Sequence, residues 1–174
     1  DWPYPTPRGG NEVISQLIKQ ENTMKTCIFI NAAVLAVTLS AAMQASAALK
    51  TCEDEIKETN TFLSEQGVAP VNDVTDLATT LRNIKNFGRL PDRYITTNEA
   101  KRLGWSGSET ETLWGVKPTN KKWIGGDSYA NPALPAKQQW LSADIDVQKG
   151  YRSPKHLIYS LSGQQRFITT DKYQ

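Results

Sequence analysis

The clearest alternation of apolar and polar positions lies in the stretch from Trp140 to Ser160. Residues 144–147 read Asp-Ile-Asp-Val, and this period of two is typical of a strand with one buried face. Residues 148–150, Gln-Lys-Gly, carry a turn signal, and residues 156–159, His-Leu-Ile-Tyr, form a second apolar run. The pattern predicts two strands joined by a tight turn.

A helical period precedes this hairpin. Apolar residues recur at i, i+3 and i+4 through a segment that opens near Asp76 and ends at Gly88, so we expect an amphipathic helix with one buried face. Thr96 and Glu99 have the spacing of a capping box, which predicts a short second helix up to Leu103. The stripe expected to face the core consists of Val74, Leu77, Leu81, Ile84 and Phe87.

After Pro118 the period changes to that of strands. The pair Gly125-Gly126 is interpreted as a β-bulge or a close backbone contact. Helices followed by antiparallel strands predict an α+β domain, with helices packed on one face of a single antiparallel sheet. The predicted strands are residues 123–127, 140–147, 156–160 and 166–170, separated by Gly, Asn, Pro or Ser.

The first 47 residues look unlike the rest of the chain. Residues 24–47 begin with Met-Lys-Thr, continue as an apolar run and end in Ala-Ser-Ala, the pattern of a secretory signal peptide. We therefore expect cleavage after Ala47 and a secreted protein, extracellular or periplasmic, without a membrane segment after cleavage. Residues 1–23 are interpreted as an upstream extension that is not native.

An acidic lead-in at residues 48–73 separates the signal peptide from the domain at residues 74–174. A helix is predicted from Cys52 to Gln66, and its thin apolar face suggests a loosely docked extension. Because Cys27 would leave with the signal peptide, Cys52 is expected to be a lone thiol.

The net charge of the 174 residues is only +2, but the charges are unevenly placed. From Leu81 onward, 15 Lys and Arg stand against 8 Asp and Glu. This basic excess suits a polyanionic partner, and it equally suits a solubilising surface. The sequence has no metal-ligand spacing and no cofactor motif, so neither a metal nor a cofactor is predicted.

Several blocks of the chain resemble one family. Residues 90–105, Leu-Pro-Asp-Arg-Tyr-Ile-Thr-Thr-Asn-Glu-Ala-Lys-Arg-Leu-Gly-Trp, resemble the first-helix to second-helix region of the barnase-type, guanyl-specific extracellular ribonucleases of bacteria. Further similar blocks follow in the family's order: Ile124-Gly-Gly-Asp127, Trp140, Ala143-Asp-Ile145, Gly150-Tyr-Arg152, Leu157-Ile-Tyr-Ser160, Thr169-Thr-Asp171 and Tyr173. The resemblance covers residues 74–174. It implies the microbial ribonuclease fold, with a last strand that is incomplete at Gln174.

The resemblance also implies a chemistry. The family cleaves single-stranded RNA after guanosine, with a glutamate as general base, a histidine as general acid, and a lysine and two arginines that neutralise the phosphate. By position, the base falls on Ser142, the acid on Lys172, the arginines on Arg152 and His156, and the lysine on Thr97. Most of the reacting groups are therefore substituted. At neutral pH a serine hydroxyl does not accept a proton unaided, and a lysine is a poor proton donor.

The basic and aromatic residues around the same positions suit either a surface for single-stranded nucleic acid or a solvated rim. Asp144 and Arg152 match a pair of residues that forms a buried ion link in the family. Asn131 matches part of a guanine-binding loop that is two residues shorter here. The residues expected to contact RNA or its phosphates are Arg152, Lys155, His156, Lys172, Asn131 and Tyr173, with Tyr151 as a further stacking platform.

Three functions are compatible with these residues. The first is a monomeric ribonuclease homologue that acts on or binds single-stranded RNA, with weak or absent activity. The second is an active endoribonuclease with a rearranged site around His156, Arg152 and Lys172, in which His156 is a relocated acid or base rather than a weak phosphate contact. The third is a protein-binding module that reuses the cleft. The resemblance adds a barstar-like inhibitor protein as an expected partner.

Overall fold

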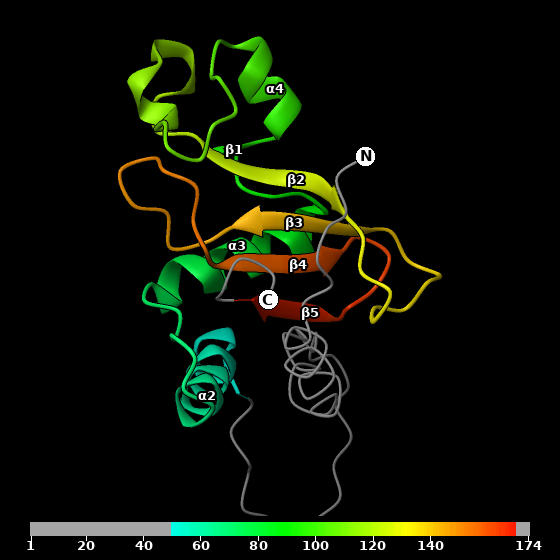
Figure 1. Cartoon of the computed structure of the whole chain (residues 1–174). Coiled ribbons are helices and arrows are strands. Elements are labelled where there is room, and N and C mark those ends of the chain that lie inside the picture. The colour runs from blue at the N-terminus through cyan, green and yellow to red at the C-terminus, as the bar shows by residue number, and fades with distance from the viewer. Residues whose placement is uncertain (1–49, 170–174) are drawn as a thin grey trace, which may run out of the picture.

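Five short strands form one sheet, in which the spatial order of the strands follows their order in the chain (Figure 1). The computed structural model describes residues 50–169. β2 to β5 pair antiparallel, whereas β1 pairs parallel with β2. The strands are β1 (Tyr94–Ile95), β2 (Trp123–Tyr129), β3 (Trp140–Asp144), β4 (His156–Ser160) and β5 (Arg166–Thr169).

The parallel pair is a departure from the predicted all-antiparallel sheet, although the α+β class is confirmed. A parallel pair needs a long crossover, whereas antiparallel neighbours can be joined by a hairpin. Residues 96–122 make the crossover and contain three short helices. These are α4 (Thr97–Arg102), η1 (Leu113–Gly115) and η2 (Lys117–Thr119). With two residues, β1 is too short to leave an alternating pattern in the sequence.

α3 (Val74–Phe87) covers one face of the sheet and lies behind it in Figure 1. The carboxylate of Asp73 caps its first turn by accepting the N–H of Asp76 at 2.9 Å. Gly88 ends the helix with a φ of 67°, a left-handed conformation that favours glycine. Both ends therefore lie close to their predicted positions.

The apolar stripe of α3 is confirmed with one exception. Leu77 and Ile84 are buried in the main core, but Phe87 is 68% exposed. The chain turns at Gly88, and Leu90 enters the main core instead. The apolar period of the sequence extends into the last turn of the helix, but the side chain of Phe87 in that turn lies at the surface.

α2 (Cys52–Glu65) is docked more firmly than predicted. Cys52 and Ile56 belong to the same core cluster as residues of α3 and of the sheet. Asn60 fastens the linker that follows, because its side chain donates to the carbonyl of Val71 at 2.9 Å and accepts the N–H of Val71 at 2.8 Å. Among residues 50–169, no helix has the length and apolar character that crossing a membrane requires.

Cys52 is disulfide-bonded, which corrects the prediction of a lone thiol. The prediction assumed that Cys27 is removed with a signal peptide, and the predicted signal peptide at residues 24–47 lies outside the described residues.

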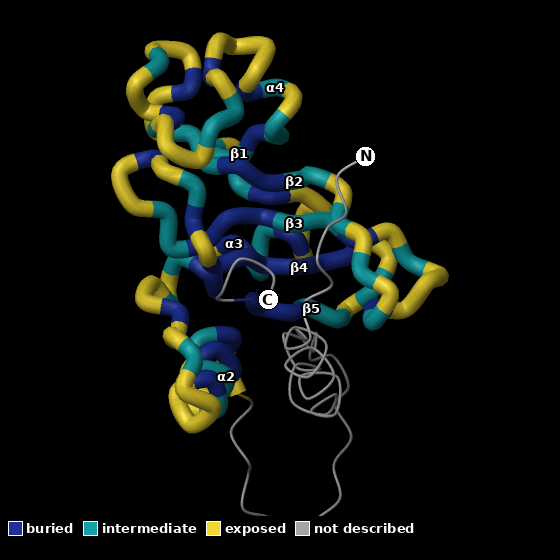
Figure 2. Tube along the Cα trace, in the orientation of Figure 1, coloured by how far each residue is buried: buried dark blue, intermediate teal, exposed yellow. Residues whose placement is uncertain are grey.

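The sheet has two different faces because side chains alternate along each strand. Figure 2 shows β4 buried along its whole length, so both faces are covered there. The face against α3 contributes Ala143, Leu157, Tyr159 and Ile168 to the main core. The opposite face, which we call the distal face, carries an apolar cluster of Leu134, Trp140, Ile158 and Phe167 and, further along the strands, the polar residues Asp127, Ser142, Asp144 and His156.

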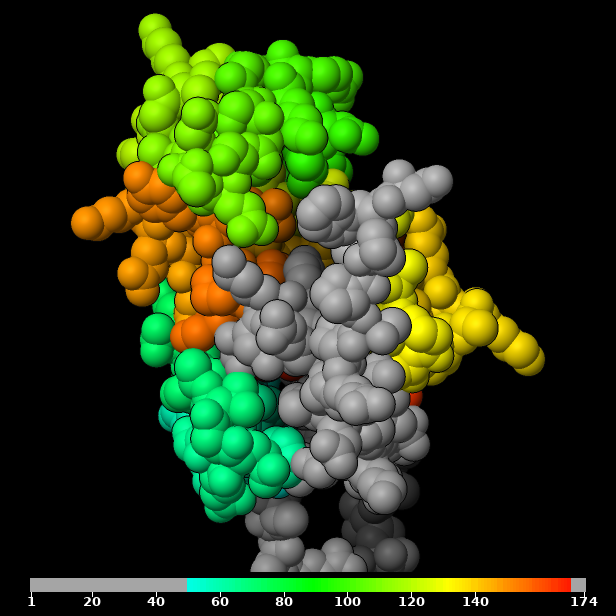
Figure 3. All heavy atoms as spheres, in the orientation of Figure 1, coloured from blue at the N-terminus to red at the C-terminus, as the bar shows by residue number. Residues whose placement is uncertain are grey.

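β3 and β4 pair as predicted, but a long loop rather than a tight turn joins them. β3 ends at Asp144, and residues 145–155 form the loop. Asp146 has a φ of 52°, a left-handed conformation that ends the extended strand. The turn itself lies where expected, since the N–H of Tyr151 donates to the carbonyl of Gln148 at 3.1 Å. The crossover helices rest against this loop (Figure 3), and the N–H of Leu113 donates to the carbonyl of Gly150 at 2.9 Å.

The carboxylate of Asp146 ties the loop to the linker before α3. It accepts the N–H of Asn72 at 2.6 Å and the N–H of Asp73 at 3.0 Å. Lys155 Nζ donates to Asp146 at 2.9 Å and to the carbonyl of Pro70 at 2.7 Å. Burial alone would raise the pKa of Asp146, but these hydrogen bonds outweigh burial and lower it.

We predict that Asp146→Asn lowers the free energy of unfolding by about 1–3 kcal/mol at neutral pH, because a buried charged acceptor is lost. Since the pKa of Asp146 is depressed in the folded state, its contribution is present above the unfolded-state pKa of about 4. The contribution is lost as the pH falls through the folded-state pKa. Urea unfolding followed by circular dichroism, repeated from neutral pH down to about pH 2, measures the difference between variant and parent.

Asp92→Asn is the matched control, because the carboxylate of Asp92 pairs with Arg89 on the exposed surface. It should change the free energy of unfolding by less than about 0.5 kcal/mol. A loss for Asp146→Asn that keeps its size in acid would contradict the proposed role of the ionised carboxylate.

Candidate functional site

The register of the strands gathers a row of polar side chains on the distal face. Asp127 of β2 lies directly opposite Ser142 of β3, and Asp144 of β3 lies opposite His156 of β4. Residues two apart on a strand share a face, so Ser142 and Asp144 point to the same side. Three strands therefore place four polar side chains beside one another. Ile158 of the apolar cluster lies next to them.

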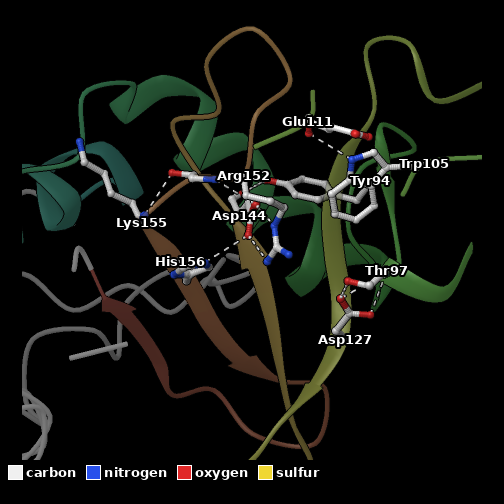
Figure 4. A network of polar contacts seen from close by, with 10 residues as sticks. Tyr94, Thr97, Trp105, Glu111, Asp127, Asp144, Arg152, Lys155 and His156 are labelled. Carbon is white, nitrogen blue, oxygen red and sulfur yellow. Dashed lines mark hydrogen bonds and ion pairs between the residues drawn. The ribbon is translucent and has the colours of Figure 1, made fainter. Parts of the chain in front are cut away.

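Asp144 is the centre of this row, as Figure 4 shows. Its carboxylate accepts Arg152 Nε at 2.7 Å, Arg152 Nη2 at 3.2 Å and the N–H of Ser153 at 3.2 Å. His156 Nε2 lies 3.3 Å from Asp144 Oδ1. Burial alone would raise the pKa of Asp144, but the hydrogen bonds from His156 and Arg152 prevail, and the pKa is lowered. Asp144 is thus an ionised carboxylate that orients a guanidinium and an imidazole.

Tyr94 and the bulge in β2 hold this centre from the other side of the sheet. The hydroxyl of Tyr94 donates to the backbone carbonyl of Asp144 at 2.7 Å. Its ring lies so close to Gly125 that a Cβ there would be 2.5 Å from it, which explains why this position has no side chain. The register shifts between Gly125 and Asp127, and this confirms the predicted bulge.

Asp127 connects the row to α4. Its carboxylate accepts the N–H of Thr97 at 3.0 and 3.2 Å and the hydroxyl of Thr97 at 2.5 Å. Thr96 caps the helix by accepting the N–H of Glu99 at 3.2 Å, at the spacing that the sequence predicted. Position 97, where the resemblance places a cationic side chain, therefore holds a neutral donor that is bound to Asp127.

Arg152 and His156 both reach the row, but with different exposure. The Arg152 side chain is 21% exposed, whereas that of His156 is 3% exposed. Arg152 is therefore the more accessible member of the pair. Two hollows on the surface, beside α2 and beside the Gly88 turn, are not lined by Asp144, Arg152 or His156.

Lys155 differs from the predicted RNA contact. Its ammonium group is committed to Asp146 and to the carbonyl of Pro70, and its side chain is 11% exposed. It holds the loop to the linker before α3 and lies outside the polar row. The sequence shows a lysine next to His156, but Lys155 is the last residue of the loop, and its ammonium group turns to Asp146 and Pro70.

The other predicted residues divide into two groups. Asn131 shapes the loop between β2 and β3, because it donates to the hydroxyl of Tyr129 at 3.2 Å and accepts the N–H of Ala133 at 2.9 Å. Tyr151 is exposed next to Arg152. Lys172 and Tyr173 lie outside the described residues.

Sequence reasoning did not identify Asp127 as a site residue. Its signal was indirect: it follows Gly125-Gly126, and a bulge re-aims the side chains after it. The pairing with Ser142 across 15 positions of sequence becomes visible only with the register. Within residues 50–169, no three His, Cys, Asp or Glu side chains gather closely enough to bind a metal ion.

The fold and the polar row define an α+β protein that presents an arginine and a histidine, both oriented by one buried aspartate, on one face of its sheet. No model of a protein family matches the chain. Curated relatives do match. The chain is 41% identical over 91 residues to a ribonuclease of Heyndrickxia coagulans, covering 50% of this chain and 80% of that protein.

Ribonucleases of Bacillus intermedius and Bacillus pumilus are also 41% identical over 91 residues. In both comparisons the match covers 54% of the relative, so the chain spans about half the length of these two proteins. The chain belongs to the ribonuclease family that these proteins represent.

We predict that Asp144→Asn lowers the free energy of unfolding by about 3–5 kcal/mol, because it removes the counter-charge of a partly buried guanidinium. The matched control is Ser142→Ala, two residues away on the same strand and face, which should cost less than about 1 kcal/mol. Urea unfolding at neutral pH measures both. Equal losses for the two variants would show that Asp144 is not the centre on which the row depends.

Proposed function

We propose that this protein is a secreted, barnase-type ribonuclease homologue that binds single-stranded RNA on the distal face and cleaves it weakly or not at all. The observation that carries the proposal is the place of Ser142. It lies between Asp127 and Ile158 in the middle of the polar row, where the resemblance puts the general base. A hydroxyl there does not take the proton of an RNA 2′-hydroxyl at neutral pH.

RNA binding is supported by the parts of the row that remain. Arg152 presents a guanidinium whose orientation is set by Asp144, and such a group suits phosphate oxygens. Tyr151 is 45% exposed beside it, and an exposed aromatic ring can stack on an unpaired base. The basic excess from Leu81 onward adds long-range attraction for a polyanion.

Weak cleavage follows from two substitutions. A general acid and a general base each contribute about 10²–10⁴-fold to such a reaction. Ser142 and Lys172 stand at these two positions of the resemblance, so the protein would retain phosphate binding without efficient proton transfer. Export through residues 24–47 is part of the proposal, because that segment has the pattern of a signal peptide.

We predict that the double variant Ser142→Glu with Lys172→His cleaves single-stranded RNA at least about tenfold faster than the parent chain, because a base and an acid are returned to the row. Gel analysis of an end-labelled RNA measures the rate. The matched control is Ser142→Gln with Lys172→His, which has nearly the same shape but no base and should show no such gain. Equal rates for the two double variants would contradict the assignment of position 142.

RNA binding is measured in parallel by fluorescence anisotropy at increasing salt. We expect the logarithm of the binding constant to fall linearly with the logarithm of the salt concentration, with a slope of about −0.7 for each phosphate neutralised. Arg152→Gln should weaken binding and reduce that slope. Binding that does not depend on salt would favour a surface for another protein instead.

One observation favours a second candidate, an endoribonuclease with a rearranged site. His156 Nε2 is 3.3 Å from Asp144, and a carboxylate that orients an imidazole is a common arrangement in proton transfer. His156→Ala in the parent chain distinguishes the two candidates. Loss of cleavage together with unchanged RNA binding would support the rearranged site, whereas unchanged cleavage would leave His156 as a structural partner of Asp144.

A further inference from the structure

Two carboxylates lie in the polar row, and their surroundings differ. Asp144 is 2% exposed and is surrounded by the side chains of Arg152 and His156 and the N–H of Ser153. Its lowered pKa and its hydrogen bonds make it an anchor. Asp127 is half-buried, and the N–H and the hydroxyl of Thr97, both neutral, donate to its carboxylate.

Among residues 50–169, no Lys, Arg or His forms an ion pair with Asp127. The carboxylate of Asp144, in contrast, is committed to Arg152 and His156. Of the two carboxylates, Asp127 is therefore the one without a cationic partner among the described residues.

The position of Asp127 suits a base. It is the direct cross-strand neighbour of Ser142, and side chains in such a pair have Cβ atoms about 4.5–5.5 Å apart. The charge of Asp127 also affects the pKa of a residue on β4. Burial raises the pKa of Tyr159 on β4 to about 12, and the charge of Asp127 contributes to the increase. Figure 4 shows Asp127 on β2 and Arg152 and Asp144 beside it toward β4, with Thr97 on the outer side of Asp127.

We propose that Asp127 is the general base for the weak RNA cleavage of this protein and takes over, from the neighbouring strand, the task that Ser142 cannot perform. This inference rests on the proposed function, because it needs RNA on the distal face. Asp127 would be a catalytic residue in direct contact with the substrate, and Thr97 a positioning residue that holds its carboxylate.

A carboxylate oxygen of Asp127 takes the proton of a ribose 2′-hydroxyl, and the 2′-oxygen forms a bond to the adjacent phosphorus. The bond from phosphorus to the 5′-oxygen of the next nucleotide breaks, and this oxygen takes a proton from a water molecule. The products are a 2′,3′-cyclic phosphate and a free 5′-hydroxyl, and Asp127 then returns its proton to solvent. Arg152 neutralises the charge on the phosphate during the step.

Thr97 makes the arrangement compatible with the fold. Its N–H keeps the carboxylate in place whether or not Asp127 carries a proton, since a carboxyl oxygen still accepts. Its hydroxyl can rotate and change partner when the carboxylate is protonated. An amide side chain at position 127 keeps an acceptor for the N–H of Thr97 but does not take a proton. Asp127→Asn therefore separates the chemical role from the structural one.

The experiment uses the full chain and a single-stranded RNA oligonucleotide labelled at one end. We expect Asp127→Asn to cleave at least about tenfold more slowly than the parent. This loss is smaller than the usual 10²–10⁴-fold effect of a general base, because Thr97 already binds the carboxylate. RNA affinity, measured by anisotropy, should stay within about twofold. Asp92→Asn, which removes an exposed carboxylate on another surface, should leave both rates and affinity unchanged.

A second variant keeps the test independent of folding. Asp127→Asn with Ser142→Glu returns a carboxylate to the adjacent strand, and it should recover the cleavage that Asp127→Asn loses. A purely structural role for Asp127 would leave the double variant as slow as the single one, and that result would overturn the inference.

Two other results would also overturn it. The first is equal cleavage rates for the parent chain and Asp127→Asn. The second is cleavage by Ser142→Glu when the parent chain does not cleave. That result would support the proposed function and show that Asp127 does not act as a base. In contrast, absence of RNA binding in the parent and of cleavage in Ser142→Glu with Lys172→His would overturn the proposed function, and this inference with it.

Discussion

The buried charge of Asp144 is the constraint on which the rest of the structure depends. An ionised carboxylate with 2% exposure is stable only with partners, because taking it out of water costs several kcal/mol. The partners come from the loop, as Arg152 and Ser153, and from β4, as His156. The loop between β3 and β4 must therefore return to β3, which explains why these strands are not joined by a tight turn.

The same loop contains a second carboxylate with a structural role, that of Asp146. Asp146 leaves the strand in a left-handed conformation and points to the linker before α3 instead of the distal face. Lys155 completes this contact from the end of the loop. Both carboxylates have lowered pKa values, since in both cases hydrogen bonds outweigh burial. One orients the polar row, and the other joins the loop to the helices that carry the main core.

Local signals in the sequence predicted most of the elements. The stripe of α3, the glycine at its end, the spacing of Thr96 and Glu99 and the paired glycines of β2 each specify a nearby conformation, and each lies where expected. The errors concern contacts between distant segments. Phe87 keeps the helical period but has no core to meet, and Lys155 looks like a phosphate ligand until the fold brings Asp146 and Pro70 to it.

The candidate site was predictable in part for the same reason. Asp144, Arg152 and His156 lie within one hairpin, so a short stretch of sequence contained them. Asp127 was not predicted, because its neighbourhood depends on how β2 pairs with β3 and on the extra residue of the bulge. A one-residue change in that register would turn Asp127 to the other face.

The polar residues of this face differ in how strongly the fold depends on them. Asp144 and Arg152 are needed for folding because a buried charge requires its partner, and the same pair aims a guanidinium at the distal face. Asp127 is needed because it holds the first turn of α4. Ser142 lies between these groups. Among the described residues, the hydrogen bonds give it no comparable structural task. A chain of this fold can therefore exchange the group at position 142 without losing the Asp144–Arg152 pair. It follows that an intact pair is an argument for the fold, and that phosphate binding by Arg152 is part of the proposed function. The capacity for proton transfer has to be judged from positions 127 and 142.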